Sequence, residues 1–268
     1  MDDKLKLLQS IFNNQYDDFD EYPVGGVSDF FIGRNVKTND EIILKIIKPT
    51  ENNRKPINEI NISKIFNHKN IVKIYDGGNF YINGMEIYFL IEKLYKYDVA
   101  SINEELSNDV FSVMRQILEG VFEIHSNSVI HRDLKLDNFL VDDNKNIVIS
   151  DFGNATYLED SFSSRLQIGK GTYAYMAPEC WADDNNNFGI DIYALGICFY
   201  ELLTKHLPFF SPSGNSYSWK IQQSTCYLPK INSVSNSMNS LLIDMTAKKW
   251  KDRPTIKEVI DRFCGIIT

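Results

Sequence analysis

The chain has few residues that could cross-link it or bind a metal through sulfur. It has four cysteines among 268 residues, Cys180, Cys198, Cys226 and Cys264, and no two of them form a C-x-x-C pair. Neither a disulfide framework nor a zinc site is indicated by this scatter. We therefore expect a reducing, cytoplasmic setting.

Long apolar runs and an excess of positive charge are also absent. The first residues, Met1-Asp2-Asp3-Lys4, are mostly polar, and no stretch has the pattern of a signal peptide or a membrane span. The 28 Lys and Arg residues are outnumbered by 36 Asp and Glu residues, for a net charge of -8. Because a phosphate-rich surface would repel such a protein, we expect neither nucleic acid nor membrane as a partner. A merely soluble acidic surface is the simpler meaning of this charge.

What the chain does have is enough apolar material for a large core. Hydrophobic residues make up 43% and aromatic residues 13% of its 31.0 kDa. This size fits one large domain, or two lobes that share an interface.

One stretch carries the residues of a phosphoryl-transfer site. It reads His131-Arg132-Asp133-Leu134-Lys135-Leu136-Asp137-Asn138, and after a short apolar run Asp151-Phe152-Gly153 follows. Phosphoryl transfer spreads negative charge over phosphate oxygens, so its site needs metal ligands, a cation and a group that orients the attacking hydroxyl. Two carboxylates, a lysine and an amide can supply these functions.

The stretch resembles the catalytic and metal-binding loops of the eukaryotic protein kinases, whose signatures are H-R-D-L-x-x-x-N and D-F-G. Both signatures are present without a substitution. The alternative is a charged loop with this spelling in an unrelated fold. The resemblance implies an α+β fold with a small antiparallel β-sheet lobe, which has one main helix, and a larger, mostly helical lobe. It places a short extension at residues 1–19 and the kinase domain at 20–268, with the small lobe at about 20–92, the hinge at about 92–98 and the large lobe at about 99–268.

The resemblance also implies a role for each residue of the two loops. Asp133 would orient the substrate hydroxyl and accept its proton, and Lys135 would offset charge on the transferring phosphate. Asn138 and Asp151 would hold Mg²⁺ between the phosphates of ATP. Leu140 would form the floor under the adenine, and Phe152 would pack in the core.

In the small lobe, residues 22–32 are predicted to form a strand, a glycine turn and a strand, and residues 41–47 a further strand that contains Lys45. By resemblance the turn covers the phosphates, although it keeps only one of three family glycines in place. Residues 57–66 have the pattern of a helix, in which Glu59 would pair with Lys45 or else be a solvated charge. Ser63 stands where the family packs an apolar residue against the metal-loop phenylalanine. The nucleotide-binding residues expected here are Pro23, Gly25, Gly26, Phe30, Ile43, Lys45 and Glu59.

The strand at residues 88–92 and the residues after it resemble the hinge between the lobes. Adenine would bond to main-chain groups near Glu92 and Leu94, and Asp98 would lie close to the ribose. An ordinary core strand followed by a surface turn is the alternative.

The remaining expectations concern the large lobe. Residues 108–126 are predicted to form a buried helix, and Asp191 opens a second one whose family counterpart braces the catalytic loop. Glu179, at the end of the A-P-E segment, would pair with Arg253. Arg132 could bind a phosphate placed on Ser161, Ser163, Ser164 or Thr172, or these could be plain loop residues.

The resemblance implies transfer of the γ-phosphate of ATP to a protein substrate. Lys135 and Thr172 favour serine and threonine hydroxyls, with dual specificity open. Two rival functions remain at this point. A pseudokinase would fit the degenerate glycine turn and Ser63, and a small-molecule phosphotransferase would share the aspartate and asparagine but lack the A-P-E segment and its arginine.

Overall fold

The computed structural model describes residues 3–12, 14–22, 29–47, 56–159, 172–182, 186–211 and 215–267. Some of the predicted site residues lie outside these ranges. They are Pro23, Gly25 and Gly26 of the glycine turn, and Ser161, Ser163 and Ser164.

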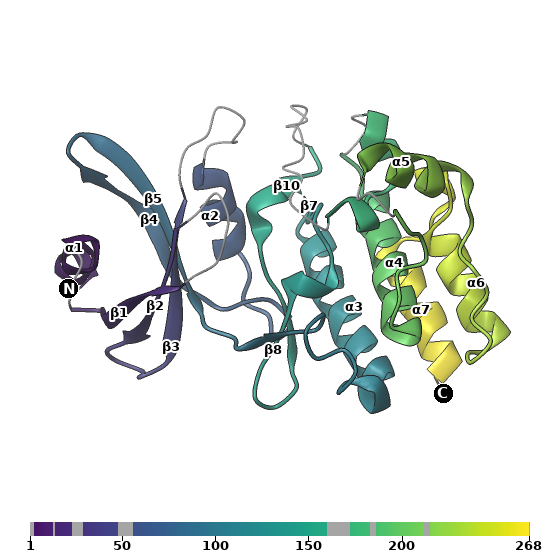
Figure 1. Ribbon diagram of the computed structural model, residues 1–268, viewed down its shortest axis with the longest axis horizontal. Helices are drawn as coiled ribbons and strands as arrows, with labels where there is room; N and C mark the ends of the chain where they lie inside the picture. The colour runs from purple at the N-terminus through teal and green to yellow at the C-terminus, as the bar shows by residue number, and fades with distance from the viewer. Residues whose placement is uncertain are drawn as a thin grey trace. The chain divides into compact units, whose positions relative to one another are not determined.

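The chain divides into two compact units, Met1–His68 with Val72–Lys96 and Lys69–Ile71 with Tyr97–Thr268. The expected α+β fold, with one strand-rich and one helix-rich part, is confirmed (Figure 1). The predicted limits of the extension, the lobes and the hinge stay a prediction. The elements of the first unit are α1 (Asp3–Phe12), β1 (Tyr16–Tyr22), β2 (Asp29–Asn35), β3 (Glu41–Ile47), α2 (Pro56–Lys64), β4 (Ile74–Ile82) and β5 (Met85–Lys93).

The second unit begins with short strands around one long helix and continues as helices. Its strands are β6 (Tyr97–Asp98), β7 (Val129–Ile130), β8 (Phe139–Val141), β9 (Ile147–Ile149) and β10 (Thr156–Tyr157). Its helices are α3 (Val110–Ser126), α4 (Gly189–Thr204), α5 (Ser216–Thr225), α6 (Asn236–Met245) and α7 (Ile256–Ile267). Within the described residues, none of the helices combines the length and apolar character that a membrane crossing requires.

The first unit is built on an antiparallel sheet in the order β1-β2-β3-β5-β4. Side chains alternate between the faces of a strand, so Ile42, Leu44 and Ile46 of β3 point to one face, where they are buried. Ile43 and Lys45 point to the other face, where both are half-buried. Phe30 lies opposite Lys45 in the register of β2 and β3, so it shares the face of Lys45.

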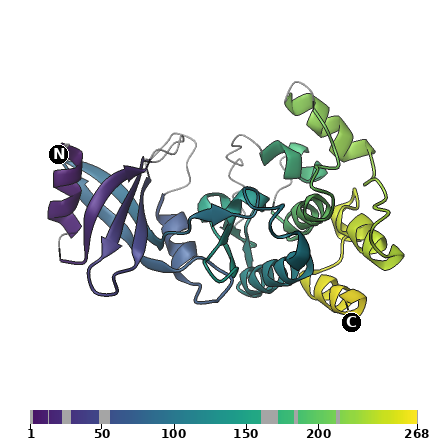
Figure 2. The same cartoon turned by 60° about the horizontal axis from the view of Figure 1, so that its bottom comes forward.

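Helix α1 packs on the face of this sheet that carries Ile42, Leu44 and Ile46 (Figures 1 and 2). Its apolar residues recur at helical spacing, and Leu8 and Phe12 are 4% and 6% exposed. The ring of Phe12 meets the ring of Phe89 of β5 edge to face, with centroids 5.0 Å apart. The first residues of the chain therefore contribute to the core of the first unit.

Helix α2 lies over the Lys45 face and packs Ile60 against Leu90 and Ile47. Ser63 on the same helix is 1% exposed, and its hydroxyl has no hydrogen-bond partner among the described residues. A buried hydroxyl in this state lowers stability, because its hydration is lost without replacement.

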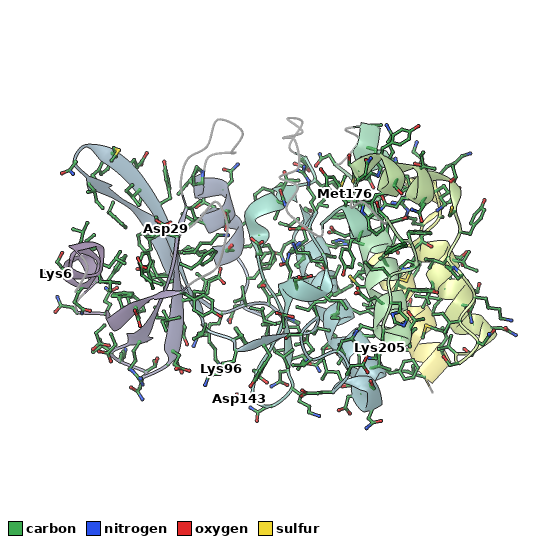
Figure 3. The ribbon with its side chains drawn as sticks, viewed as in Figure 1. Lys6, Asp29, Lys96, Asp143, Met176 and Lys205 are labelled. Carbon is green, nitrogen blue, oxygen red and sulfur yellow. The ribbon has the colours of Figure 1, made fainter. Side chains whose placement is uncertain are left out.

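In the second unit, α4 is buried along most of its length, as its nearly continuous apolar sequence predicts. The prediction that α3 is a buried helix is only partly right, because one side of it faces solvent, where Phe111 and Phe122 are 40% and 43% exposed. Gly120 allows α3 to approach β9, since a Cβ there would lie 2.7 Å from Ile149 Cδ1. The hairpin of β8 and β9, whose turn is marked by Asp143 in Figure 3, pairs Phe139 with Ile149.

The packing of α1 predicts a difference between two neighbouring substitutions. Phe12→Ala removes a buried ring and should lower the free energy of unfolding by about 3 kcal/mol. Ile11→Ala is the matched control, since Ile11 is 38% exposed and its loss should change stability by less than about 1 kcal/mol. Urea unfolding followed by circular dichroism measures both, and equal losses would show that α1 does not belong to this core.

Candidate active site

The predicted catalytic loop is held by one buried carboxylate. Asp191, in the first turn of α4, accepts hydrogen bonds from the backbone N–H groups of His131 and Arg132, each at 2.8 Å. It also contacts His125 Nε2 at 2.9 Å. Arg132 has a φ of 69°, a left-handed conformation that few residues with side chains adopt, and these hydrogen bonds help to hold it there.

The ionisation state of Asp191 follows from these contacts. Burial by itself would raise its pKa, but the hydrogen bond and electrostatic interaction with His125, the electrostatic interaction with His131 and the N–H of Arg132 outweigh burial and lower the pKa. Asp191 is therefore an anion at neutral pH, with its charge shared among several donors.

Asp133 and its neighbours directly follow His131 and Arg132, whose backbone is held by Asp191. Asp133 is 8% exposed, and the ammonium group of Lys135 lies 3.6 Å from its carboxylate. Asn138 donates from Nδ2 to the carbonyl oxygen of Asp133 at 2.8 Å. This hydrogen bond leaves the amide oxygen as the group of Asn138 that can bind a cation.

The β8–β9 hairpin brings Asn138 and Asp151 together. Since Phe139 pairs with Ile149, Asn138 comes opposite Ser150, whose N–H and hydroxyl both donate to the carbonyl oxygen of Asn138, at 2.9 and 3.1 Å. Asp151 follows with φ 62° and ψ 76°, and its carboxylate accepts from the N–H of Gly153. The asparagine and the aspartate thus leave adjacent strand ends.

His131 and Phe152 are packing residues, a role that the resemblance implies for Phe152. They are 0% and 2% exposed, with ring centroids 5.0 Å apart. A ring nitrogen of His131 lies 3.0 Å from the carbonyl oxygen of Ser150, so this histidine connects the two loops.

In the first unit, Lys45 and Glu59 form an ion pair. Lys45 Nζ lies 2.6 Å from Glu59 Oε1, and the two side chains are 15% and 10% exposed. Phe30 and Ile43 share the sheet face of Lys45, as described above. Three of the predicted nucleotide-binding side chains therefore lie on one face, beside α2.

The predicted hinge residues are only partly arranged as expected. The N–H of Leu94, expected to meet adenine, donates to the carbonyl oxygen of Glu41 at 3.0 Å, so adenine would have to displace Glu41 to use it. Glu92 pairs with Ile43 within the sheet. In the second unit Asp98 lies opposite Leu140 in the pairing of β6 with β8, and its carboxylate accepts from the N–H of Ser101.

The segment that follows residue 171 is tied to the second unit by a bidentate ion pair. Both terminal nitrogens of Arg253 donate to Glu179, at 2.6 and 2.8 Å, and the guanidinium side chain is 0% exposed. Arg253 also donates to the carbonyl oxygens of Gly189 and Ala247. Thr172 begins the 3-10 turn Thr172–Tyr175, and its side chain lies outside the described residues.

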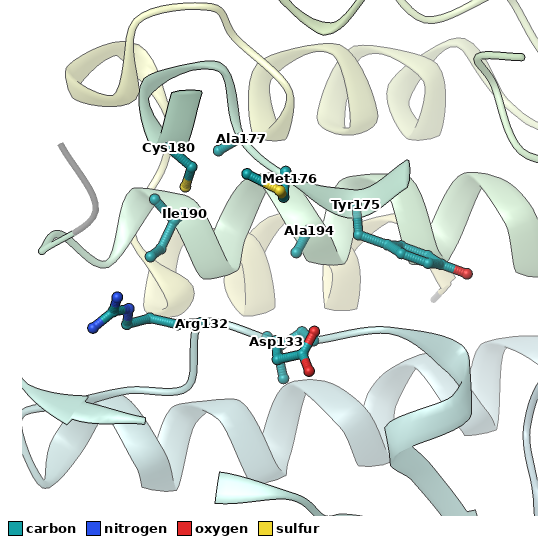
Figure 4. Close-up of a pocket in the computed structure, with 9 residues that line it drawn as sticks. Arg132, Asp133, Tyr175, Met176, Ala177, Cys180, Ile190 and Ala194 are labelled. Atoms are coloured by element: carbon teal, nitrogen blue, oxygen red, sulfur yellow. The ribbon is translucent and has the colours of Figure 1, made fainter. Parts of the chain in front are cut away.

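A small cavity of about 20 Å³ separates the catalytic loop from this segment (Figure 4). Its volume suits little more than one water molecule. The residues that line it are Arg132, Asp133, Leu134, Tyr175, Met176, Ala177, Cys180, Ile190 and Ala194.

A carboxyl group that the sequence did not reveal lies near this cavity. Tyr175 donates to Glu201 Oε2 at 2.6 Å. Burial and the nearby charge of Asp137 raise the pKa of Glu201, although the hydrogen bond from Tyr175 opposes them. Glu201 and Asp137 place negative charge beside the predicted substrate segment.

The donor set fits a magnesium site completed by phosphate oxygens. Asn138 and Asp151 offer an amide and a carboxylate oxygen, the ligands that Mg²⁺ prefers, and Mg²⁺ usually takes few protein ligands. Among the described residues no group of three or more His, Cys, Asp or Glu side chains forms a metal site.

The sequence reasoning missed His125 and Ser150, which hold Asp191 and Asn138. Ser150 lies directly after the apolar strand β9, and His125 lies in the last turn of α3, next to the polar Ser126. Since their partners are far apart in the sequence, no local pattern identifies them.

Comparison with known sequences agrees with this arrangement. The sequence matches the protein kinase domain family over residues 22–263. The chain belongs to the protein kinase family.

Relatives from distant organisms share the domain. The serine/threonine-protein kinase PrkC of Bacillus subtilis is 30% identical over 84% of this chain and 36% of its own length. The serine/threonine-protein kinase shk1/pak1 of Schizosaccharomyces pombe is 28% identical over 96% of this chain and 40% of its own length. A protein of Acanthamoeba polyphaga mimivirus, named as a serine/threonine-protein kinase, is 29% identical over 85% of this chain and 86% of its own length. The chain thus spans about four-tenths of the first two relatives.

The pair of Glu179 and Arg253 predicts a large loss of stability on substitution. Glu179→Gln leaves a buried guanidinium without its counter-charge and should lower the free energy of unfolding by about 3 kcal/mol. Asp244→Asn is the control, because Asp244 meets Arg262 at the surface at 2.8 Å, and its loss should change stability by less than about 1 kcal/mol. Thermal unfolding of both variants decides, and a loss for Glu179→Gln no larger than that of the control contradicts the prediction.

The unpaired hydroxyl of Ser63 predicts that replacing this residue by alanine increases the stability of the protein. Ser63→Ala should raise the free energy of unfolding by about 1 kcal/mol, since it removes a buried polar group without a partner. Ser240→Ala, at an exposed position within α6, controls for the helix propensity of alanine, which accounts for at most about 0.5 kcal/mol. Equal gains in urea unfolding would assign the whole effect to helix propensity.

Proposed function

We propose that this chain is an active protein kinase, which transfers the γ-phosphoryl group of ATP to serine or threonine hydroxyls of protein substrates. The observation that carries the proposal is the catalytic loop. Asp191 fixes its backbone, Asp133 lies beside the ammonium of Lys135, and Asn138 is joined through Ser150 to the strand end that carries Asp151.

In this mechanism Asp133 accepts a hydrogen bond from the substrate hydroxyl and aims its oxygen at the γ-phosphorus. As the oxygen–phosphorus bond forms and the bond to ADP breaks, the hydroxyl proton passes to Asp133. Lys135 offsets negative charge on the phosphoryl oxygens during transfer. Asn138 and Asp151 would hold Mg²⁺, which supplies charge neutralisation on the phosphates.

Lys45 would contribute a cation to the phosphates from the first unit. Its pairing with Glu59 supports this role, because the ion pair fixes the orientation of the ammonium group on the sheet face shared with Phe30 and Ile43. Assignment to serine and threonine rests on Lys135 and Thr172, and on the names of the relatives.

A catalytically silent kinase domain is the second candidate. The buried hydroxyl of Ser63 and the engaged N–H of Leu94 favour it, since both weaken features on which nucleotide binding depends. The four polar groups of Lys45, Asp133, Asn138 and Asp151 favour the active enzyme, because a domain without turnover has no chemical need for all four.

The test compares Asp133→Asn with the wild-type chain in phosphate incorporation from labelled Mg·ATP into a generic basic protein. We expect incorporation by the wild type, a fall of about 10³-fold in kcat for the variant and little change in KM for ATP, because Asp133 acts on the hydroxyl rather than on the nucleotide. Asp143→Asn, in the turn between β8 and β9, is the control and should retain full activity.

Mass-spectrometric mapping of the product gives the hydroxyl specificity. Phosphoserine and phosphothreonine are the expected products. Label in a metabolite but not in protein would favour a small-molecule phosphotransferase. Incorporation that is absent in the wild type, or unchanged in Asp133→Asn, would overturn the assignment of an active enzyme.

A further inference from the structure

The second unit contains a larger cavity that the proposed chemistry does not use. It has a volume of about 600 Å³, within the usual range for small-molecule sites. It lies between the last turn of α3, the start of α4, and the residues that lead into α7. None of the proposed reacting or metal-binding groups, Asp133, Lys135, Asn138 or Asp151, lines it.

The walls of this cavity are mainly apolar. Phe188 stacks on the ring of His125, with centroids 4.4 Å apart, and both rings line the space. Leu158, Phe188 and Trp250 are only half-buried, so apolar surface remains for an apolar ligand to cover. The apolar residues of the wall are Leu158, Phe188, Ile192, Trp250, Pro254 and Ile256.

The polar part of the lining is positive, although the protein as a whole has a net charge of -8. His125 and Arg253 line the cavity but are engaged by Asp191 and Glu179. Lys251 and Lys257 form no ion pair within the described part of the chain, and no carboxylate residue lines the cavity. Both lysines are exposed, so their ammonium groups can reach an anion at the mouth.

At the start of α4, the partial positive charge of the helix N-terminus is offset by the carboxylate of Asp191 in the first turn, so the two lysines are the anion-binding groups of the lining. Asn187 also lines the cavity. It is 5% exposed, and neither atom of its amide has a hydrogen-bond partner among the described residues. A ligand acceptor beside residues 187–189 would satisfy the Nδ2 donor of this amide.

We propose that this cavity binds a small anionic amphiphile, with an apolar chain or ring against Phe188 and Trp250 and a carboxylate held by Lys251 and Lys257. The two parts of the site adjoin each other, since Lys251 Nζ lies 5.3 Å from the centroid of the Trp250 ring. A cation of equal chain length would meet Lys251 and Lys257 with the wrong sign.

The test uses decanoate, below its micelle concentration, with the full chain. Isothermal titration calorimetry should give one site per chain, and decyltrimethylammonium should bind at least tenfold more weakly. The fluorescence change on binding should disappear in Trp250→Phe, while calorimetry on that variant still detects the site. Circular dichroism should stay constant throughout.

Two variants assign the binding to this cavity. Lys251→Glu combined with Lys257→Glu should weaken decanoate binding at least tenfold, and the matched control, Lys220→Glu combined with Lys230→Glu on exposed lysines outside the cavity, should change it less than twofold. Leu158→Trp places a larger side chain in the lining and should weaken decanoate binding at least threefold.

The proposal is wrong if decanoate fails to bind at 1 mM, or if decyltrimethylammonium binds as tightly as decanoate does. Equal affinity in the Lys251 and Lys257 variant, or in Leu158→Trp, overturns it too. Binding at many sites with a loss of circular dichroism would identify a detergent effect and would also overturn it. None of these readouts uses phosphate transfer, so the cavity and the proposed kinase activity stand or fall separately.

Discussion

The predicted catalytic loop depends on a carboxylate that is almost completely buried. Asp191 is 1% exposed, and two backbone N–H groups and His125 surround it. A buried anion is costly unless it is fully hydrogen-bonded, so the donors cannot leave one at a time without a large penalty. The folded-state pKa is lowered, so this contribution to stability is present above the ordinary carboxyl range and is lost as the pH falls through the lowered value. Asp191 thus helps to hold the backbone of Arg132, while His131 and Asn138 hold the backbone of Asp133.

A second constraint, the register of a short hairpin, joins the two loops that carry the proposed metal ligands. A shift of one residue between β8 and β9 would turn Asn138 away from Ser150 and would place apolar side chains on the wrong face. The buried residues Phe139, Ile147 and Ile149 fix the register, so core packing sets the geometry of the polar groups at the strand ends. The ion pair of Lys45 with Glu59 has a separate support, since α2 and the sheet hold it within the first unit.

The sequence predicted best where a motif or a strict periodicity was present. The strand at residues 41–47 agrees with β3, and the pairs of Glu179 with Arg253 and of Lys45 with Glu59 were expected from spacing to known motifs. The packing of α1 was not expected, because an amphipathic segment does not show which surface it covers. His125 and Ser150 were missed because a hydrogen bond between distant segments leaves no local pattern. The N–H of Leu94 is a further example, because it donates to the carbonyl oxygen of Glu41. A motif predicts which residue stands at a position, but it does not predict the hydrogen-bond partner of that residue's backbone.

The cavity and the catalytic loop share His125. One side of its ring is stacked by Phe188 at the cavity, while Nε2 meets the carboxylate that fixes His131 and Arg132. A ligand changes an equilibrium only by binding one conformation better than another. If the hydrogen bonds between Asp191 and the loop broke, the carboxylate would stay buried with fewer donors, which is unfavourable. The conformation with these hydrogen bonds intact is therefore the one in which His125 is ordered beside the cavity. A ligand that packs against His125 and Phe188 would therefore favour the loop conformation in which these hydrogen bonds are intact. His125 would in this way couple the order of the loop to ligand binding in the cavity.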